Sequence, residues 1–156
     1  MPSILFVCTG NLHRSPIAEY LFRQKTGARP NWKIASAGTY TRDGLPAPPE
    51  VLTVLARYGI DARRHRTREV TRTLLENCDL ILCMASNHKE ALHAEFPDLA
   101  KRIHLLSEMA GETEDIEDPI GGPMAEFETA AREIDHYLTL GFNRIVQLAQ
   151  TPGDGM

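Results

Sequence analysis

The chain has 156 residues, of which 42% are hydrophobic and 24% are charged, and this length suits one domain with a core of its own. With 17 basic and 21 acidic side chains its formal net charge is −4, which excludes the global basic field that nucleic-acid-binding proteins use. The longest apolar runs, at residues 4–8 and 80–85, are far shorter than the ~20 residues of a membrane helix, and we expect no secretory signal at the start of the chain.

Short apolar runs alternate with amphipathic stretches along the chain. Residues 3–8 are typical of a strand covered on both faces, and apolar side chains at helical spacing predict a helix at residues 15–25. We then predict, in chain order, a strand at 32–37, a loop at 42–49, helices at 49–58 and 68–75, a strand at 79–84, a helix at 86–95, a strand at 102–106, a loop at 111–123 and a long helix at 124–149 bent near Gly141. This alternation predicts an α/β fold in which a mostly parallel sheet has helices on both faces. We expect one domain at residues 1–150 and a flexible tail at 151–156.

The loop after the first strand carries the strongest functional signal in the chain. Ligands of parallel sheets bind where strands end, and the amides of a turn that enters a helix form a site for a tetrahedral oxyanion. Gly10 and Asn11 tolerate the left-handed backbone that such a turn needs. Arg14 follows Cys8 by six residues and can hold two oxygens of a phosphoryl group. The same positive surroundings favour the thiolate form of Cys8, and Ser15 can donate a hydrogen bond to that sulfur.

The alternative interpretation of this loop is a buried, inert cysteine followed by a capping turn. The coincidence of Cys8, the Gly-Asn pair and the Arg-Ser pair at a strand-to-helix junction favours a phosphate-binding loop. No Walker A loop is present, and one glycine is too few for a dinucleotide fingerprint. The predicted phosphate-binding residues are Thr9, Gly10, Asn11, Leu12, His13, Arg14 and Ser15.

Further motifs are distributed over nearly the whole chain, at residues 8–11, 14–16, 18–19, 36–38, 59–65, 79–84 and 118–119. In these motifs the chain resembles the low-molecular-weight protein-tyrosine phosphatases. The resemblance implies a single α/β domain of Rossmann-like, three-layer type with a four-stranded parallel sheet. It also implies hydrolysis of phosphotyrosine in proteins through a cysteinyl-phosphate intermediate, with no metal and no other cofactor.

A general acid is needed to protonate the leaving group of such a reaction. The loop at residues 112–118 offers five carboxylates, and composition alone cannot choose among them. The resemblance selects Asp118, because the acid of the family sits in an Asp-Pro pair, and Pro119 restricts the backbone of the residue before it. The expected catalytic residues are therefore Cys8, Arg14 and Asp118.

The resemblance also implies residues that support the loop and residues that line the substrate pocket. Asn11, Ser15, Ser36 and His65 would support the loop. Taken alone, Asn11, Ser36 and His65 each have a plainer interpretation, as a turn residue, a strand-end hydroxyl and a surface histidine. The expected pocket residues are Thr9, Leu12, Tyr40 and Ile120. His13 occupies the position where many family members have a second cysteine, and it would either add positive charge near the thiolate or point to solvent.

The substrate stays open between two phosphorylated side chains. Ile120 stands where many tyrosine-specific members place an aromatic wall, while Thr9 and the Asp-Pro-x-Gly-Gly sequence resemble the protein-arginine phosphatase branch. We rank phosphotyrosine first, because it is the broader activity of the family. Arsenate reductase activity is disfavoured, since no cysteine follows Cys83.

A non-catalytic phosphate-binding module is the alternative from a different class of function. Pure binding needs neither a thiolate nor an acid, so the joint presence of Cys8, Arg14 and Asp118 argues against it. The expected partner is a phosphorylated protein, with inorganic phosphate as product and with no nucleic acid or membrane involved. Three cysteines without a CxxC pair favour a reducing, cytoplasmic setting, and the oligomeric state stays open.

Overall fold

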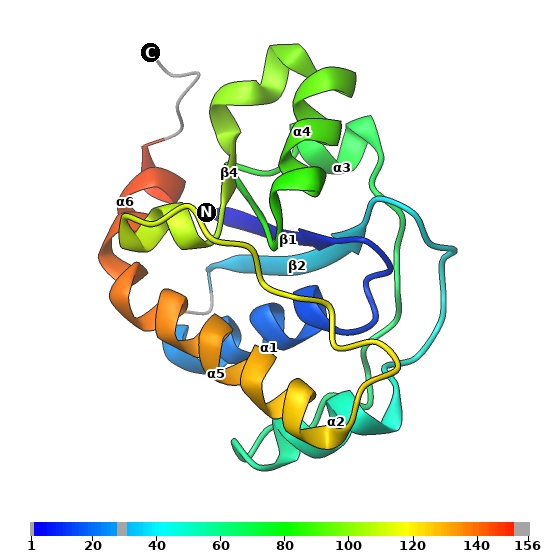
Figure 1. Ribbon diagram of the computed structural model, residues 1–156. Coiled ribbons are helices and arrows are strands. Elements are labelled where there is room, and N and C mark those ends of the chain that lie inside the picture. Colours follow the sequence, from blue (N-terminus) through cyan, green and yellow to red (C-terminus); the bar gives the residue numbers. More distant parts are fainter. Residues whose placement is uncertain (1, 28–30, 152–156) are drawn as a thin grey trace.

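Four parallel strands form one sheet in the order β2-β1-β3-β4 (Figure 1) in a computed structural model that describes residues 2–27 and 31–151. The strands are β1 (Ser3–Cys8), β2 (Lys33–Gly38), β3 (Leu80–Cys83) and β4 (Ile103–Leu105). The pairs β1–β2, β1–β3 and β3–β4 are all parallel. This confirms the predicted α/β fold with its four-stranded parallel sheet.

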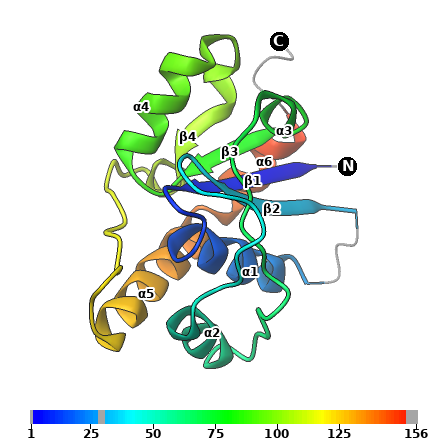
Figure 2. The same cartoon turned by 90° about the vertical axis from the view of Figure 1, so that its right-hand side faces the viewer.

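Helices cover both faces of this sheet, which gives three layers (Figures 1 and 2). One face is covered by α1 (Arg14–Thr26), α2 (Pro49–Ala56), α5 (Met124–Leu140) and α6 (Phe142–Gln150). The other face is covered by α3 (Arg72–Glu76), α4 (Ser86–Glu95) and the 3-10 helix η1 (Pro97–Arg102). A second 3-10 helix, η2 (Ser107–Ala110), packs against α5 and α6.

The central strand β1 explains why its sequence is apolar without interruption. Ile4, Phe6 and Cys8 face the layer of α1, while Leu5 and Val7 face the layer of α4. All five side chains are at most 2% exposed, because a parallel strand in the middle of a sheet is covered on both faces. The strand order reverses at β1, so the loop that follows Cys8 lies at the switch point where open α/β sheets bind ligands.

Two predicted helices differ from the observed ones. The helix predicted at residues 68–75 begins only at Arg72, because Arg68 and Val70 exchange backbone hydrogen bonds with Gly38 and so stay extended. The helix predicted at residues 124–149 is two helices, and they meet at Gly141, where the bend was predicted. A Cβ on Gly141 would lie 2.6 Å from the Cβ of Met109, so η2 approaches too closely for any other residue there.

Smaller differences concern the ends of elements and the chain terminus. The helix predicted at residues 49–58 ends at Ala56, and neither 3-10 helix was predicted. Most of the tail predicted at 151–156 lies outside the described residues.

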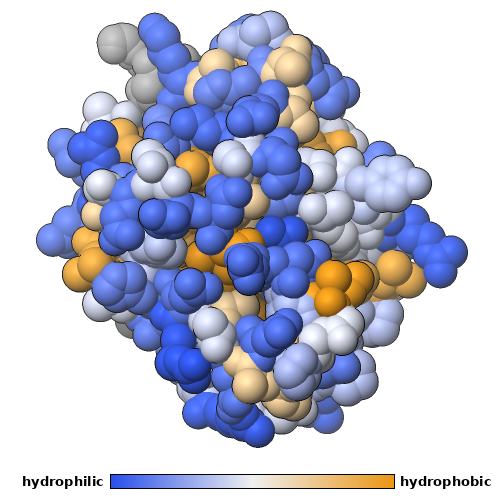
Figure 3. Space-filling model, in the orientation of Figure 1, coloured by the Kyte–Doolittle hydropathy of each residue, from blue (hydrophilic) through white to orange (hydrophobic). Residues whose placement is uncertain are grey.

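The described surface is mainly polar. Figure 3 shows hydrophilic residues over most of one face, with apolar residues in small separate groups. The large hydrophobic side chains that are well exposed among the described residues are Tyr40, Ile120 and Leu140. None of the helices described has both the length and the apolar character needed to cross a membrane.

Gly38, at the end of β2, lies directly against the loop that follows β1. A Cβ at this position would be 2.5 Å from the carbonyl oxygen of Thr9 and 3.0 Å from the amide nitrogen of Asn11. We therefore expect Gly38→Ala to displace the loop and to lower the free energy of unfolding by ~1–3 kcal/mol. Urea denaturation measures the stability, and amide chemical shifts of residues 9–15 report the displacement.

Gly59→Ala is the matched control for this substitution. Gly59 has a φ of +77° with no atom within 4 Å of the added Cβ, so the cost is backbone strain of ~1–2 kcal/mol. Its loop resonances should match those of the wild type. Unchanged loop resonances in Gly38→Ala would contradict the close approach described here.

Candidate active site

The loop between β1 and α1 has backbone amides that neither element uses. β1 ends at Cys8 and α1 begins at Arg14, so the amides between them are available to a ligand at a helix N-terminus. Asn11 has a φ of 57° and is the one non-glycine residue with a positive φ in the described part of the chain. Gly10 does not adopt the left-handed conformation that the sequence suggested for it, so Asn11 alone makes this turn.

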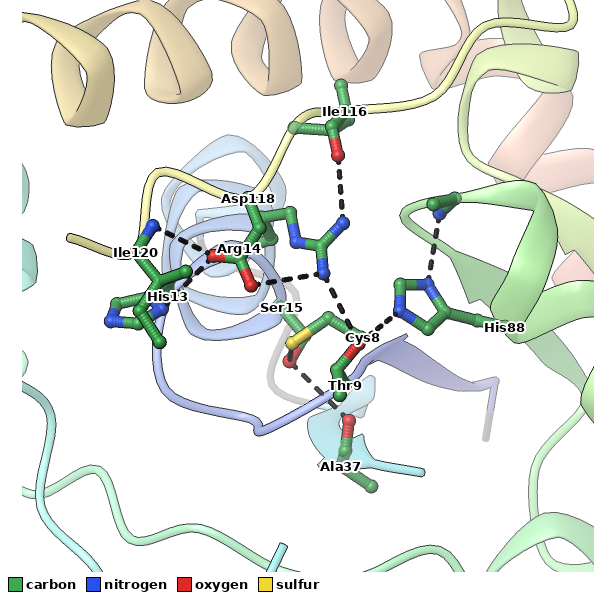
Figure 4. Close-up of polar contacts among 11 residues, drawn as sticks. Cys8, Thr9, His13, Arg14, Ser15, Ala37, His88, Ile116, Asp118 and Ile120 are labelled. Atoms are coloured by element: carbon green, nitrogen blue, oxygen red, sulfur yellow. Dashed lines mark hydrogen bonds and ion pairs between the residues drawn. The ribbon is translucent and has the colours of Figure 1, made fainter. Parts of the chain in front are cut away.

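The sulfur of Cys8 lies beside the hydroxyl of Ser15, and Figure 4 shows both at the centre of the loop. The Cys8 side chain is 2% exposed, and its Sγ is 3.0 Å from Ser15 Oγ. The side-chain nitrogen Nδ2 of Asn11 donates to Ser15 Oγ at 2.9 Å. The hydroxyl is the acceptor of this hydrogen bond, so its own proton is free for another partner. The Cys8 sulfur is a closer partner for that proton than the carbonyl of Ala37, which is 3.5 Å away.

A buried carboxylate lies at the other end of this hydrogen-bond chain. Ser36 Oγ donates to Glu19 Oε1 at 2.7 Å and accepts from the Asn11 amide at 2.9 Å. Glu19 is 7% exposed and forms an ion pair with Arg23 at 2.9 Å. Because the Glu19 carboxylate only accepts, Ser36 is the donor to it, and because a side-chain NH2 only donates, both hydroxyls accept from Asn11. The chain ends at the contact between Ser15 Oγ and the Cys8 sulfur, in which either group can be the donor.

Two further contacts hold Asn11 in its strained conformation. The backbone amide of Arg68 donates to Asn11 Oδ1 at 3.0 Å, which sets the orientation of the side-chain amide. His65 Nε2 donates to the Asn11 carbonyl at 2.8 Å. His65 is 4% exposed, and burial lowers its pKa from the ordinary value. His65 is thus a buried brace of the loop and not a surface histidine.

Arg14 lies between the loop after Cys8 and the segment that carries Ile116 and Asp118 (Figure 4). Its Nη1 donates to the carbonyl of Ile116 at 2.8 Å. Its Nη2 is 3.4 Å from Thr9 Oγ1 and 3.5 Å from Asp118 Oδ2. Its Nε is buried without a hydrogen-bond partner in the described part of the chain. A buried guanidinium with an unpaired donor is suited to receive an oxyanion.

Asp118 lies beside the loop with its side chain 33% exposed. Its Oδ1 accepts from the amide of Ile120 at 3.1 Å and lies 3.3 Å from His13 Nδ1. The ring of His13 packs edge-on against Phe127, and burial lowers the pKa of His13 despite the nearby Asp118. His13 therefore contacts the candidate acid. The sequence had suggested that it either adds positive charge near the thiolate or points to solvent, and the structure corrects both expectations.

The segment that carries Asp118 is fixed at two points before it reaches the site. The amide of buried Ile116 donates to the Met84 carbonyl at 2.9 Å. The Asp115 carboxylate accepts from the amide of Ser86 at 2.8 Å and from its hydroxyl at 3.1 Å, at the start of α4. This segment, the acid loop at residues 112–118, is therefore attached to the end of β3 and to α4.

The four residues expected in the substrate pocket differ in their surroundings. Tyr40 is 85% exposed, and its backbone amide donates to the Thr9 carbonyl at 2.9 Å, so it lies next to the loop. Ile120 is 66% exposed and follows the Asp-Pro pair. Leu12 is half-buried, and half-buried Thr9 contacts His88 Nε2 at 2.8 Å.

Sequence reasoning assigned no role to Glu19, His88, Asp115 or Ile116. Glu19 follows Ser15 by one helical turn and interrupts an apolar helix face, which is a readable signal for a buried polar network. His88 follows β3, the neighbour of β1, so its place near the same sheet edge was also accessible. The roles of Asp115 and Ile116 depend on the path of a loop, which no local pattern specifies.

Comparison with known proteins reveals clear relatives. Residues 3–148 match the sequence model of the family described as low molecular weight phosphotyrosine protein phosphatase. The chain is 40% identical over 128 residues to a probable low molecular weight protein-tyrosine-phosphatase EpsP of Ralstonia solanacearum, which covers 82% of this chain and 85% of that protein. It is 32% identical over 149 residues to a protein-arginine-phosphatase of Geobacillus stearothermophilus, covering 95% and 96% of the two chains. The crystal structure of a low molecular weight protein tyrosine phosphatase from T. tengcongensis matches with a TM-score of 0.86 at 37% identity, over 92% of this chain and 99% of that one.

Proposed function

The chain belongs to the low molecular weight phosphotyrosine protein phosphatase family, and on that premise we propose that it hydrolyses phosphotyrosine in proteins through Cys8, Arg14 and Asp118. The contact that carries this proposal is the 3.0 Å approach of Ser15 Oγ to Cys8 Sγ. Asn11 donates to the same hydroxyl, so the Ser15 proton is free to be donated to the sulfur once Cys8 carries the negative charge that the reaction needs. A stabilised thiolate at the floor of an anion-binding loop is the nucleophile that phosphoryl transfer to cysteine requires.

In the first step the loop amides and the Arg14 guanidinium hold the phosphoryl oxygens. The Cys8 thiolate attacks phosphorus in line, a sulfur–phosphorus bond forms and the bond from phosphorus to the leaving oxygen breaks. Asp118 gives its proton to that oxygen, so tyrosine leaves as a neutral phenol. Negative charge stays on the phosphoryl oxygens, where the amides and Arg14 stabilise it.

In the second step water replaces the leaving group. Asp118, now ionised, accepts a proton from the water as the water oxygen attacks phosphorus. The sulfur–phosphorus bond breaks and inorganic phosphate is released. The departing sulfur regains its negative charge, which the Ser15 hydroxyl stabilises by hydrogen bonding.

The surroundings of the loop support an aromatic leaving group. Tyr40 is 85% exposed and its backbone is bonded to the loop, so its ring can offer a stacking surface to a phenol, in place of the aromatic wall that Ile120 does not supply. Phosphoarginine is the second candidate, because of the 32% identity to a protein-arginine-phosphatase and the Asp-Pro-x-Gly-Gly sequence. Thr9 does not favour it, since Arg14 and His88 both donate to its Oγ1 and leave no lone pair for a substrate guanidinium.

The partner in this proposal is a phosphorylated protein, and the product is inorganic phosphate. The three cysteines, Cys8, Cys78 and Cys83, form no disulfide, which fits a reducing cytoplasm as the site of action.

Cys8→Ser tests the nucleophile. We expect turnover of p-nitrophenyl phosphate to fall more than about a thousandfold, because the weaker nucleophile replaces the thiolate. Binding of inorganic phosphate, measured by calorimetry, should persist because the amides and Arg14 remain. Cys78→Ser is the control, since the Cys78 thiol donates to the Leu74 carbonyl at 3.1 Å and a hydroxyl can do the same. Full activity in Cys8→Ser would refute the mechanism. If the wild type were inactive, the non-catalytic phosphate-binding module would be the supported alternative.

Asp118→Ala tests the general acid. The loss of kcat should be about a hundredfold or more for alkyl and phenyl phosphates and much smaller for p-nitrophenyl phosphate, whose leaving group needs little protonation. Glu117→Ala, which removes an exposed carboxylate from the same loop, should behave as the wild type. An equal loss on all leaving groups would exclude Asp118 as the proton donor.

Initial rates on matched peptides that carry phosphotyrosine or phosphoarginine decide between the two substrates. We expect faster turnover of the phosphotyrosine peptide, and Tyr40→Ala should reduce that rate because the stacking surface is lost. Equal or faster turnover of the phosphoarginine peptide would reverse the assignment.

A further inference from the structure

His88 is a buried histidine next to the candidate active site for which the mechanism above has no use. It lies in the first turn of α4, on the face of the sheet opposite α1, and is 1% exposed. Figure 4 shows its ring pointing at Thr9, the residue that follows the nucleophile.

The hydrogen bonds of the ring determine which nitrogen carries the proton. The backbone amide of Ala85 can only donate, and it lies 3.1 Å from His88 Nδ1. The proton of the neutral ring is therefore on Nε2, which lies 2.8 Å from Thr9 Oγ1 and donates to it. Burial, together with the positive charge of Arg14, lowers the pKa of His88 to about 4, so the ring is neutral at ordinary pH.

This donation decides what the Thr9 hydroxyl can do. Arg14 Nη2 also approaches Thr9 Oγ1, at 3.4 Å, so both lone pairs of that oxygen face donors. The proton of the hydroxyl is then the group left to point into the loop. A hydroxyl in this state is a donor for a phosphoryl oxygen, and it also holds the guanidinium of Arg14 in place.

We propose that His88 is a positioning residue, which orients the Thr9 hydroxyl as a donor to the bound phosphoryl group and braces Arg14 through the same oxygen. This inference rests on the proposed function, since the phosphoryl group is the ligand that the loop would bind. The ring of His88 makes its hydrogen bonds to Thr9 and Ala85, and the structure shows none from it to Cys8 in the described part of the chain.

A purely structural role is the competing explanation, because His88 also caps α4 through the Ala85 amide. The start of α4 has a second cap, however. The Asp115 carboxylate accepts from both the amide and the hydroxyl of Ser86. Helix capping therefore does not depend on His88 alone, and the two nitrogens of its ring can be tested separately.

Two conservative variants separate the two roles. In His88→Asn the side-chain oxygen takes the place of Nδ1 and keeps the cap, but the side chain is too short to reach Thr9. In His88→Gln the amide nitrogen takes the place of Nε2 and keeps the donor to Thr9. We expect His88→Asn to lower kcat/KM for p-nitrophenyl phosphate about tenfold, the effect of one well-placed hydrogen bond, and to weaken inorganic phosphate binding by a similar factor. His88→Gln should stay within about threefold of the wild type in both measurements.

Controls make the comparison specific. His93→Asn, on the same helix, removes a contact with the Ile103 carbonyl and should leave kcat/KM unchanged. Thr9→Val removes the His88–Thr9 hydrogen bond without altering α4, so adding His88→Asn to it should cost little more. Urea denaturation of each variant shows whether the fold is retained, and Thr9→Val keeps the test available if a His88 variant does not fold.

The outcomes are distinct. Wild-type activity and phosphate affinity in His88→Asn would overturn the proposal. It would also be overturned if His88→Asn and His88→Gln were equally impaired, or if the loss of kcat/KM in the double variant of Thr9→Val and His88→Asn were the full product of the two single losses. If the wild type turns over no aryl phosphate, the proposed function fails. The phosphate affinities of the two variants, measured by calorimetry, still test the role of His88 in that case.

Discussion

The candidate site depends on a hydrogen-bond chain that links a buried carboxylate to the sulfur of Cys8. It starts at the Glu19 carboxylate, which accepts from Ser36, and it ends where Ser15 Oγ lies 3.0 Å from the sulfur of Cys8. Asn11 stands between the two hydroxyls and donates to both. Since the side-chain NH2 of Asn11 only donates, both hydroxyls accept from it, and the proton of Ser15 is free to stabilise a thiolate at Cys8, which can only accept.

The same site is held together from three parts of the chain. The phosphate loop follows β1, the acid loop precedes α5, and the first turn of α4 contacts both. Asp115 ties the acid loop to Ser86, and His88 ties the phosphate loop through Thr9. Arg14 completes the connection by donating to the carbonyl of Ile116. Such mutual support holds the groups of the proposed reaction in a fixed arrangement.

The sequence predicted the parts of this structure that local patterns specify. The apolar run of β1, the loop after Cys8 and the alternation of strands and helices were readable because burial and backbone geometry constrain residue type directly. The helix expected at residues 68–75 was wrong at its start, because pairing with Gly38 outweighed helical spacing. His13 was misplaced for a related reason, since its contact with Asp118 joins segments far apart in the chain. Long-range contacts of this kind leave no periodic trace.

The central claim is that phosphate passes through the sulfur of Cys8. Phosphorus NMR of the protein, denatured rapidly at alkaline pH during turnover of an aryl phosphate, tests it directly. The account predicts a thiophosphate ester on the peptide that contains Cys8, absent from Cys8→Ser. A phosphoryl group on any other residue would contradict this claim. The claim would also be contradicted if Asp118→Ala, in which the intermediate should accumulate, turned over the substrate with no phosphorylated protein detected.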